Sequence, residues 1–381
     1  MEWMGTELTP LWDYLKKNER TVVLYGMGNG ADKILSVCEE KGIPVREVFA
    51  SDGFVRNKLF HGMPVRSWND VKAQYGAQNL TVLLSFASSL PDVLDNITRI
   101  SRETELFAPD VPVFGNTLFD ARFLEENRQA LLSARALLSD AESQRIFDLV
   151  IRYKVTGRIE PLLLARNDPL AVMRELVEPT SVRVAADLGA YNGDTVRELL
   201  NAGARPEQIL AFEPDARNFR KLSDYAAQET RTKVSPVRAA AWSCADTLVF
   251  DAGGNRNASV TQNRSSVLKD RPIKLTELPA LPLDALTENI RVDYIKYDVE
   301  GSEQEALIGS AQTIARSYPT LLVSLYHRSE DIFSLPLQIH QAFPAYKGFY
   351  LRRFGGIPAW DLNLYVKKET PHELHDHRLL P

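Results

Sequence analysis

Four carboxylates in the C-terminal half of the chain lie at the ends of short apolar runs. Asp187 lies in VAADLG, Glu213 ends QILAFE, and Asp298 and Glu300 follow VDYIKY. Such runs are typical of buried parallel strands. In an open parallel sheet the carboxyl ends of the strands meet at one edge, where ligands bind. We therefore expect these acids to surround a ligand that attracts negative charge.

A glycine-spaced turn follows the first of these strands. Gly189 and Gly193 let the backbone approach a ligand closely, and Asp194 opens a helix whose first N–H groups are free to donate. Asp187 and Asp194 would repel a pyrophosphate. They would attract an ammonium or sulfonium group by roughly 1–4 kcal/mol at 4 Å. The charges therefore favour S-adenosylmethionine over NAD as the cofactor.

Residues after the second and third strands are candidates for the rest of the cofactor. Glu213 follows Gly189 by 24 residues, and an acid at this strand end accepts hydrogen bonds from both ribose hydroxyls. Ala241 and Trp242 follow the third strand, where they would lie beside an adenine ring. A tryptophan at a strand end is also typical of a hydrophobic core, so Trp242 could either contact the adenine or pack in the core.

The fourth and fifth strands bring acids and a histidine to the edge where a methyl acceptor would bind. Asp298 and Glu300 follow the fourth strand and His327 follows the fifth, in SLYH. His327 is the best general base by residue type, with Asp298 orienting it or the acceptor hydroxyl. Alternatively, the three side chains bind a divalent cation that lowers the acceptor's pKa. His327 could instead make a structural hydrogen bond, and Glu300 could cap the next helix.

Strand and helix signals alternate in two series, which predicts two α/β units with parallel sheets. Residues 1–120 are expected to form a small Rossmann-like domain, with strands at TVVLY, IPVREVFASD, LTVLLSFAS and VPVFG. Residues 121–180 have helical periodicity and are expected to form a helical connector that covers the next domain. Residues 181–368 form the longer series, which ends in the two β-rich runs YKGFYLRRFG and DLNLYVKK. Residues 369–381 form a polar tail.

The N-terminal series has a glycine-rich turn of its own. Gly26, Gly28 and Ala31 match the dinucleotide-binding spacing, and Asp52 ends the next strand. This turn could bind NAD or a sugar nucleotide, or serve only as a tight strand–helix connection. An oxidoreductase would also need a catalytic Lys, His or Tyr facing the turn, and none is evident.

The composition restricts the partners. A net charge of −5 gives no general attraction to nucleic acid or anionic membrane, and no apolar run reaches the roughly 20 residues of a membrane span. The N-terminal stretch lacks the features of a signal peptide, so we expect a cytoplasmic protein. Cys38 and Cys244 are too few for a disulfide framework or thiolate metal site. The histidines of HELHDH at 372–377 lie in the tail and are given no role.

The segments DLGAYNGDT, AFEPD, AAAW and IKYDVEGSEQEAL together resemble the FkbM family of S-adenosylmethionine-dependent methyltransferases, over roughly residues 180–330. The resemblance implies a parallel sheet that ends in a β-hairpin. It also implies O-methylation of a hydroxyl on a sugar, polysaccharide or secondary-metabolite acceptor. The family often has an acidic residue where this chain has Leu325.

The family's functional residues match two groups of positions in this chain. The cofactor residues are expected at Asp187, Gly189, Gly193 and Glu213, and the site acids at Asp298 and Glu300. A non-catalytic nucleotide-binding scaffold is the alternative to an enzyme, and the acids at three strand ends argue against it. The sequence leaves open whether the chain forms a homo-oligomer.

Overall fold

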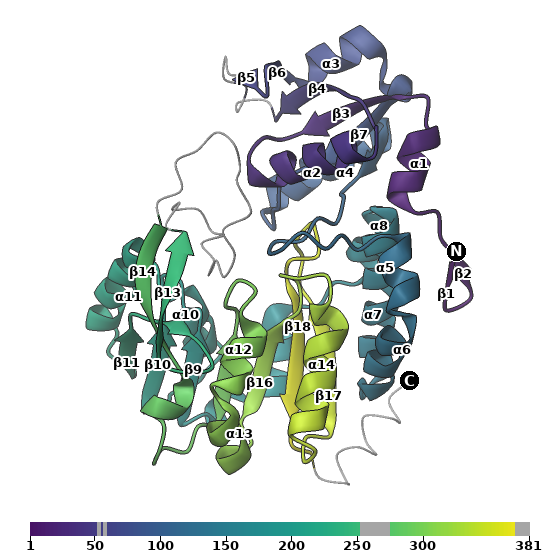
Figure 1. Cartoon of the computed structure of the whole chain (residues 1–381). Helices are drawn as coiled ribbons and strands as arrows, with labels where there is room; N and C mark the ends of the chain where they lie inside the picture. Colours follow the sequence, from purple (N-terminus) through teal and green to yellow (C-terminus); the bar gives the residue numbers. More distant parts are fainter. Residues whose placement is uncertain (52–54, 56–58, 252–274, 370–381) are drawn as a thin grey trace.

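The computed structural model describes residues 1–51, 55, 59–251 and 275–369. They form two α/β units, with the smaller, N-terminal unit above the larger one in Figure 1. No helix within these ranges is both long and apolar enough to span a bilayer. A two-stranded hairpin, β1 (Glu2–Trp3) and β2 (Thr6–Glu7), precedes the small unit.

The small unit contains a six-stranded sheet in the order β5-β6-β4-β3-β7-β8, parallel except for the β5–β6 pair. Its strands are β3 (Thr21–Tyr25), β4 (Val45–Ala50), β5 (Leu59–Phe60), β6 (Met63–Ser67), β7 (Leu80–Leu84) and β8 (Glu105–Phe107). Its helices are α1 (Leu11–Lys17), α2 (Asn29–Glu40), α3 (Trp68–Tyr75) and α4 (Pro91–Glu103). The expected strand VPVFG at 111–115 was wrong, because these residues are irregular and the last strand is β8. Pro112 has no N–H for a strand ladder.

Helices follow the small unit, as the periodicity predicted. They are α5 (Ala121–Glu126), α6 (Arg128–Leu137), α7 (Ala141–Thr156), α8 (Glu160–Leu164) and α9 (Pro169–Val172), then a π-helical turn at Met173–Val177. Asp140 begins α7 as an N-cap, since its side chain accepts a hydrogen bond from the Ser143 N–H. The cap satisfies a backbone donor that the helix itself leaves free.

The large unit contains a seven-stranded sheet in the order β11-β10-β9-β15-β16-β18-β17, in which β18 runs antiparallel to the other six strands. Its strands are β9 (Val184–Leu188), β10 (Gln208–Phe212), β11 (Lys233–Val237), β15 (Tyr294–Tyr297), β16 (Thr320–Ser324), β17 (Gly348–Arg353) and β18 (Leu362–Lys367). Six of them lie within runs predicted to be strands, β11 begins two residues before its predicted run SPVRAAAWS (235–243), and the terminal hairpin is confirmed. The strand order reverses between β9 and β15, where an open sheet binds its ligand.

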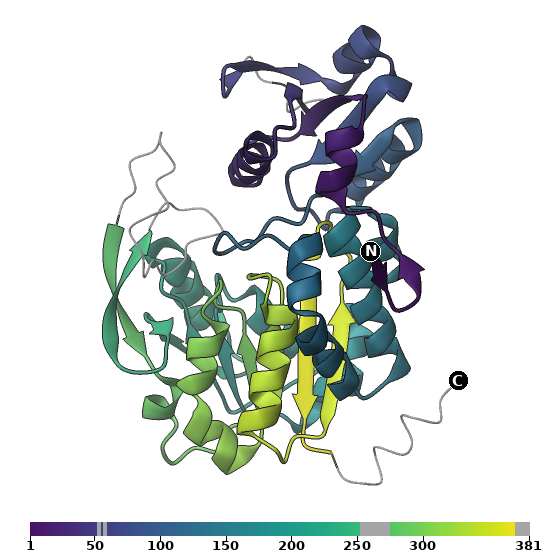
Figure 2. The ribbon, with the colours of Figure 1, turned by 45° about the vertical axis from the view of Figure 1, so that its right-hand side comes forward.

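Helices cover both faces of the large sheet (Figures 1 and 2). They are α10 (Asp194–Asn201), α11 (Ala216–Gln228), α12 (Glu303–Ile308), α13 (Ala311–Ser317) and α14 (Asp331–Ala342). Successive strand residues point to opposite faces, so Ala185 and Tyr294 pack toward α10, whereas Ala186 and Ile295 belong to the core on the other face.

The large unit also contains a small sheet that the sequence reading did not predict. Strands β12 (Ala240–Ala241), β13 (Asp246–Asp251) and β14 (Leu275–Leu281) pair in the order β12-β14-β13. The small sheet has its own hydrophobic cluster, which includes Trp242.

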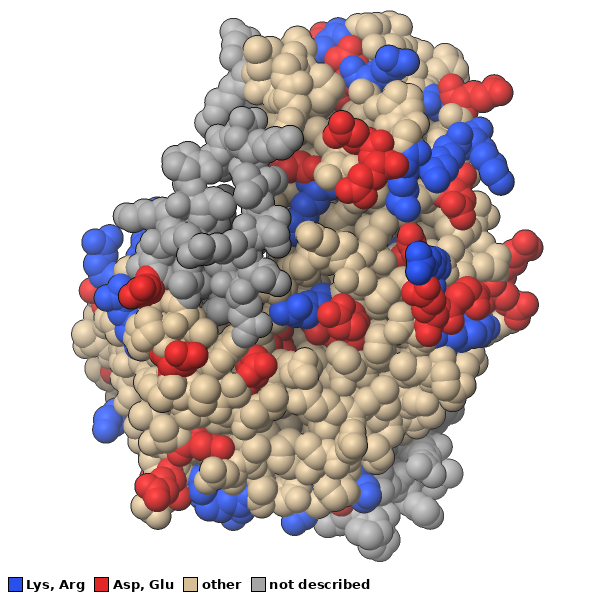
Figure 3. Space-filling model, viewed as in Figure 1, with Lys and Arg blue, Asp and Glu red and all other residues tan. Residues whose placement is uncertain are grey.

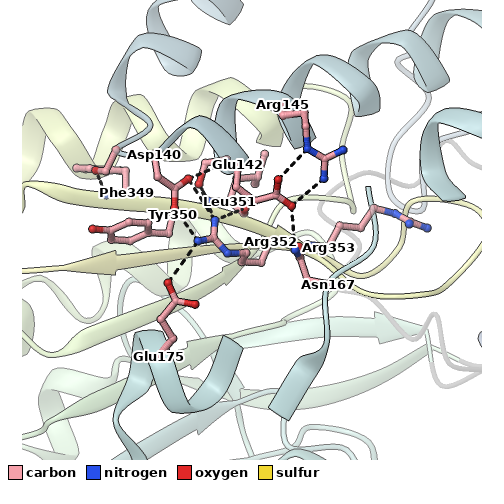
Figure 4. A network of polar contacts seen from close by, with 12 residues as sticks. Asp140, Glu142, Arg145, Asn167, Glu175, Phe349, Tyr350, Leu351, Arg352 and Arg353 are labelled. Atoms are coloured by element: carbon pink, nitrogen blue, oxygen red, sulfur yellow. Dashed lines mark hydrogen bonds and ion pairs between the residues drawn. The ribbon is translucent and has the colours of Figure 1, made fainter. Parts of the chain in front are cut away.

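A polar network attaches α7 and the segments that follow it to the edge strand β17 (Figure 4). Arg352 is 4% exposed and donates to Asp140 Oδ2 at 2.6 Å and to Ser143 Oγ at 2.8 Å. The Ser139 N–H donates to the Phe349 carbonyl oxygen, and the Phe349 N–H donates to Ser139 Oγ. These contacts pair the outer edge of β17, which would otherwise offer free backbone groups to another chain.

Candidate active site

The turn after β9 lies directly against the end of β15. Gly189 has a φ of +97°, and a Cβ atom there would overlap the carbonyl oxygen of Asp298. The Asp298 N–H donates to Leu188 O at 3.0 Å. Only glycine permits this approach. The predicted cofactor turn and the predicted acceptor acid are therefore adjacent.

A buried ion pair connects the same two strands. Lys296 of β15 lies opposite Asp187 of β9 in the strand register, and its Nζ is 3.3 Å from Asp187 Oδ1 and 3.4 Å from Asp298 Oδ2. Burial by itself would lower the pKa of Lys296, but the two carboxylates raise it above its usual value. Thr195 Oγ donates to Asp187. The sequence reading missed Lys296, although a lysine between apolar strand residues was a usable signal.

Glu213 lies at the carboxyl end of β10 and is 6% exposed. Its Oε1 accepts a hydrogen bond from the Asp215 N–H at 2.8 Å. Burial raises the pKa of this carboxyl to about 8. At neutral pH the group thus loses its proton more readily once a ligand donates hydrogen bonds to it.

The other predicted cofactor residues lie around the same edge. Gly193 has a φ of +84° and packs against Tyr225, and Asp194 is exposed in the first turn of α10. Trp242 is 7% exposed and packs in the small sheet's hydrophobic cluster, and Ala241 pairs with Leu281 of β14. The structure thus gives Trp242 a core contact.

Asp298, Glu300 and His327 converge at the ends of β15 and β16. His327 Nε2 lies 3.5 Å from Asp298 Oδ1 and 3.5 Å from Glu300 Oε2, and Tyr326 donates to Asp298 Oδ1 at 2.8 Å. Burial would raise the pKa of Asp298, but Lys296 and His327 hold it below its usual value. Asp298 is therefore ionised at neutral pH.

His327 is fully buried, and a second glutamate that the sequence reading missed approaches it. Its Nδ1 lies 2.8 Å from Glu303 Oε1. Burial would lower the pKa of His327, but Glu303, Glu300 and Asp298 raise it to about 10. At neutral pH the imidazole is therefore protonated and is a poor proton acceptor.

Two glutamates, Glu300 in the loop between β15 and α12 and Glu303 at the start of α12, make different contacts. Glu303 Oε1 accepts a hydrogen bond from the Val299 N–H at 2.9 Å. Glu300 has a φ of +54°, and its side chain makes no cap at the start of α12. Burial raises the pKa of Glu300 to about 7. Glu300 lies beside the histidine and does not cap the next helix, the alternative that the sequence left open for it.

A cavity of about 190 Å³ lies on the α10 side of the sheet. Its wall includes Asp187, Lys296, Asp298 and Tyr326. Complete ligand sites have volumes of roughly 300–1,000 Å³, so this cavity has room for only part of a ligand.

The small unit faces this edge of the large sheet. Ser88 and Ile357 exchange two backbone hydrogen bonds of 3.0 Å, which join the loop after β7 to the loop between β17 and β18. Both loops lie at the carboxyl edge of their sheets, so the carboxyl edges of the two sheets face each other (Figure 2).

The irregular segment after β8 lies between the two units. Lys33 of α2 donates to Pro112 O and Val113 O, each at 2.6 Å. The Phe114 N–H donates to His327 O at 2.8 Å, and its ring packs against Gly301 and under Arg328. Burial lowers the pKa of Lys33 to about 8 although Glu300 raises it. The small unit therefore contributes to the surroundings of Glu300 and His327.

In the N-terminal glycine-rich turn, close packing explains why Gly26 and Gly30 are glycines. A Cβ at Gly26 would overlap Phe86, and one at Gly30 would overlap the Ser85 carbonyl oxygen, whereas Gly28 has open space around it. Asp52 lies outside the described residues, as do His372, His375 and His377.

Charged side chains are mixed on the face that Figure 3 shows. Lys and Arg alternate with Asp and Glu over its described part, without a broad area of either sign. This part of the surface offers no extended basic patch of the kind that binds nucleic acid.

Residues 187–351 match the family model of the methyltransferase FkbM domain. This part of the chain is a methyltransferase FkbM domain. The predicted family and fold class are thereby confirmed. The matched region begins at Asp187 and includes Glu213, Asp298, Glu300 and His327.

The FkbM methyltransferase from Methylobacillus flagellatus KT is similar in structure over nearly the whole chain. The TM-score is 0.68 with 20% identity, covering 93% of this chain and 92% of that one. The arrangement with an additional N-terminal unit is therefore shared. An rRNA methylase from Streptococcus thermophilus matches with 11% identity and a TM-score of 0.35, over 54% of this chain and 98% of that one. No curated protein matches the chain.

Proposed function

We propose that this FkbM methyltransferase transfers the methyl group of S-adenosylmethionine to a hydroxyl oxygen of a sugar, polysaccharide or secondary metabolite. The observation that carries the proposal is the position of Asp298. It is ionised, its side chain is 28% exposed, and it touches the cofactor turn at Gly189 on one side and the buried histidine on the other.

The cofactor would bind along the carboxyl ends of β9 and β10. The turn from Gly189 to Gly193 brings backbone groups close to the ligand, and Glu213 would accept hydrogen bonds from the ribose hydroxyls. Asp194 adds an exposed negative charge that attracts the cofactor's positive groups. Asp187 shares its charge with Lys296 and therefore serves mainly to hold the turn against β15.

The acceptor hydroxyl would bind beside Asp298 and Glu300. A carboxylate accepts a hydrogen bond from a hydroxyl and can then take its proton. We assign this proton-accepting role to Asp298 rather than His327, because His327 is fully buried and its pKa is raised to about 10. The positive imidazolium and Lys296 then keep Asp298 in its ionised form.

The reaction is an in-line displacement at the methyl carbon. The acceptor oxygen forms the new C–O bond while the C–S bond breaks. The electron pair of the C–S bond stays on sulfur, which gives S-adenosylhomocysteine. The hydroxyl proton passes to the carboxylate of Asp298. Alignment of the two reactants provides most of the acceleration, and the small unit assists by enclosing the acceptor side.

A methyl-transfer assay tests the proposal directly. The full chain is incubated with S-adenosylmethionine carrying a ¹³C-methyl group and, separately, with free sugars, nucleotide sugars, polyhydroxylated polyketides and amines. We expect S-adenosylhomocysteine to accumulate with a hydroxylated acceptor, and NMR of the product to show an O-methyl group. Transfer to amines or to carbon alone would contradict O-methylation. Failure to bind S-adenosylhomocysteine in calorimetry would contradict the cofactor assignment.

A further inference from the structure

We propose that Asp298, Glu303 and His327 bind a divalent cation beside the acceptor position. The assignment of an acceptor there rests on the proposed function, whereas the cation site itself rests on the side chains. One carboxylate oxygen from each acid and one ring nitrogen of the histidine all lie within 4.8 Å of one another. Cations such as Mg²⁺ bind such atoms at about 2.1 Å, which places opposite ligands about 4.2 Å apart. Small side-chain movements would therefore complete the site.

The second observation is that buried polar atoms in the cluster lack hydrogen-bond partners. Glu303 Oε2 has none among the described residues, and neither ring nitrogen of His327 makes a hydrogen bond there, although Nδ1 is in ion-pair contact with Glu303 Oε1. The side chains of His327 and Glu303 are 0% and 1% exposed. Buried polar atoms are nearly always paired, and an unpaired one calls for an explanation such as an ion. Here all three atoms belong to the cluster that the cation would occupy.

The charge around His327 also favours a cation. Glu300 Oε2 lies 3.5 Å from the His327 Nε2, and Asp331, 3% exposed, lies close enough to Glu303 and His327 to interact with both electrostatically. Burial is costly for a carboxylate unless an opposite charge compensates it. Lys296 compensates Asp298 from one side only. A divalent ion would balance the negative charge of the remaining carboxylates. It would replace the proton that the imidazole otherwise carries.

The chemistry of the ligands suggests which ions the site accepts. One imidazole and two or three carboxylates form a mixed nitrogen and oxygen set, which suits Mn²⁺ and Mg²⁺ and lacks the thiolates that select softer metals. An ion there would bind the acceptor oxygen as a Lewis acid and lower the pKa of its hydroxyl. Asp298 is then both a cation ligand and the neighbour of the cofactor turn.

Mn²⁺ binding to the metal-stripped full chain, measured by electron paramagnetic resonance in the absence of cofactor, tests the site. We expect one saturable Mn²⁺ per chain, displaced by Mg²⁺, and an affinity at least about tenfold lower in Glu303→Gln. Glu305→Gln is the matched control, because Glu305 is in the same helix but outside the cluster. Absence of saturable binding, or equal affinity in the parent and Glu303→Gln, overturns the proposal.

Two further measurements keep the result interpretable. Circular dichroism checks the fold of Glu303→Gln, and Asp298→Asn replaces it if that variant does not fold, since Asp298 is partly exposed at a strand end. S-adenosylhomocysteine binding is measured in parallel in the presence of EDTA. Binding of S-adenosylhomocysteine without Mn²⁺ binding rejects the cation site and leaves the methyltransferase function standing. Mn²⁺ binding without S-adenosylhomocysteine binding supports the cation site and rejects the proposed methyltransferase function.

Discussion

Lys296 and Asp187 face each other across neighbouring parallel strands, with Nζ and Oδ1 3.3 Å apart and both side chains less than a tenth exposed. The same ammonium lies 3.4 Å from Asp298 Oδ2. One cation thus joins Asp187, the penultimate residue of β9, to Asp298, which follows β15. Its charge opposes the effect of burial on both acids: the pKa of Asp298 falls below its usual value, whereas burial still raises that of Asp187.

Replacing Lys296 with Met should therefore destabilise the protein. Removal of one partner leaves buried carboxylates without compensation, which costs about 3–5 kcal/mol in comparable pairs. We expect the free energy of unfolding, measured by urea denaturation, to fall by that amount in Lys296→Met. Adding Asp187→Asn should restore part of the loss, because the second change removes one uncompensated charge. A loss below about 1 kcal/mol would show that the ammonium is hydrated and not buried.

Gly189→Ala should disrupt the contact between the cofactor turn and β15. The added methyl group would overlap the Asp298 carbonyl oxygen, and the backbone has a φ of +97°. Gly203→Ala is the control, because its φ is +111° but its nearest neighbour, a Thr180 methyl, is 3.9 Å from the new Cβ. Overpacking costs about 1–3 kcal/mol beyond the backbone penalty. We expect a lower melting temperature and lost S-adenosylhomocysteine binding in Gly189→Ala only, and equal effects of the two substitutions would contradict the contact.

Sequence patterns were sufficient for six of the seven strands of the large sheet, and the buried parallel strands β9, β10, β15 and β16 were recognised as apolar runs ending near glycines or acids. The strand β11, KVSPV, has no such run and was predicted two residues late. They were also sufficient to place Asp187, Glu213 and Asp298 at one edge. Lys296 was missed because its meaning depends on register. It lies in an apolar strand, and only the pairing with β9 shows that it meets an acid.

The role of Glu303 and the contacts of the small unit could not be predicted from the sequence either. Glu303 follows Asp298 by five residues, but the left-handed backbone of Glu300 and Gly301 is what turns its side chain back toward His327. No local pattern specifies that turn. The contact between Phe114 and His327 joins residues far apart in the sequence, and periodicity carries no information about such packing between units.

Cofactor affinity should depend on pH through Glu213. Burial raises the pKa of Glu213 to about 8 from an ordinary 4.5, and the ribose hydroxyls need the ionised form. Below pH 8 binding must first remove a proton, so the affinity for S-adenosylhomocysteine should rise with pH up to about 8 and then level off. The slope is at most tenfold per pH unit. Calorimetry between pH 6 and 9 measures this.

Glu213→Gln is the control for that titration. The amide cannot ionise, so we expect weaker binding whose remaining pH dependence reflects other groups. Glu213→Ala should lose about 1.5–3 kcal/mol of binding free energy, the usual worth of charge-assisted hydrogen bonds. A parent affinity that is constant between pH 6 and 8 would place the ribose elsewhere.

Asp298→Asn should separate chemistry from cofactor binding. The amide keeps the shape and the hydrogen bond from Tyr326 but cannot take a proton, so we expect the methyl-transfer rate to fall by roughly 10²–10⁴. The dissociation constant for S-adenosylhomocysteine should change little. Asp224→Asn, an exposed change on α11, controls for nonspecific loss. Lost cofactor affinity in Asp298→Asn would instead make Asp298 part of the cofactor site.

Lys33→Met should weaken acceptor binding from the small unit, far from Asp298 in sequence. Its ammonium holds two carbonyl oxygens just before Phe114, which packs on the loop carrying Glu300. Each hydrogen bond from a charged group is worth about 1.5–3 kcal/mol, so we expect KM for the acceptor to rise at least about tenfold. Cofactor affinity should not change.

Lys16→Met, an exposed change on α1, is the matched control for that substitution. Because the pKa of Lys33 is lowered to about 8, the parent should lose the same contribution as the pH rises through 8 and the ammonium becomes neutral. Lys33→Met should show no such loss of acceptor affinity above pH 8. If both proteins had the same acceptor KM at pH 7, the small unit would not shape the acceptor site through this contact, and its role would be limited to covering the sheet edge.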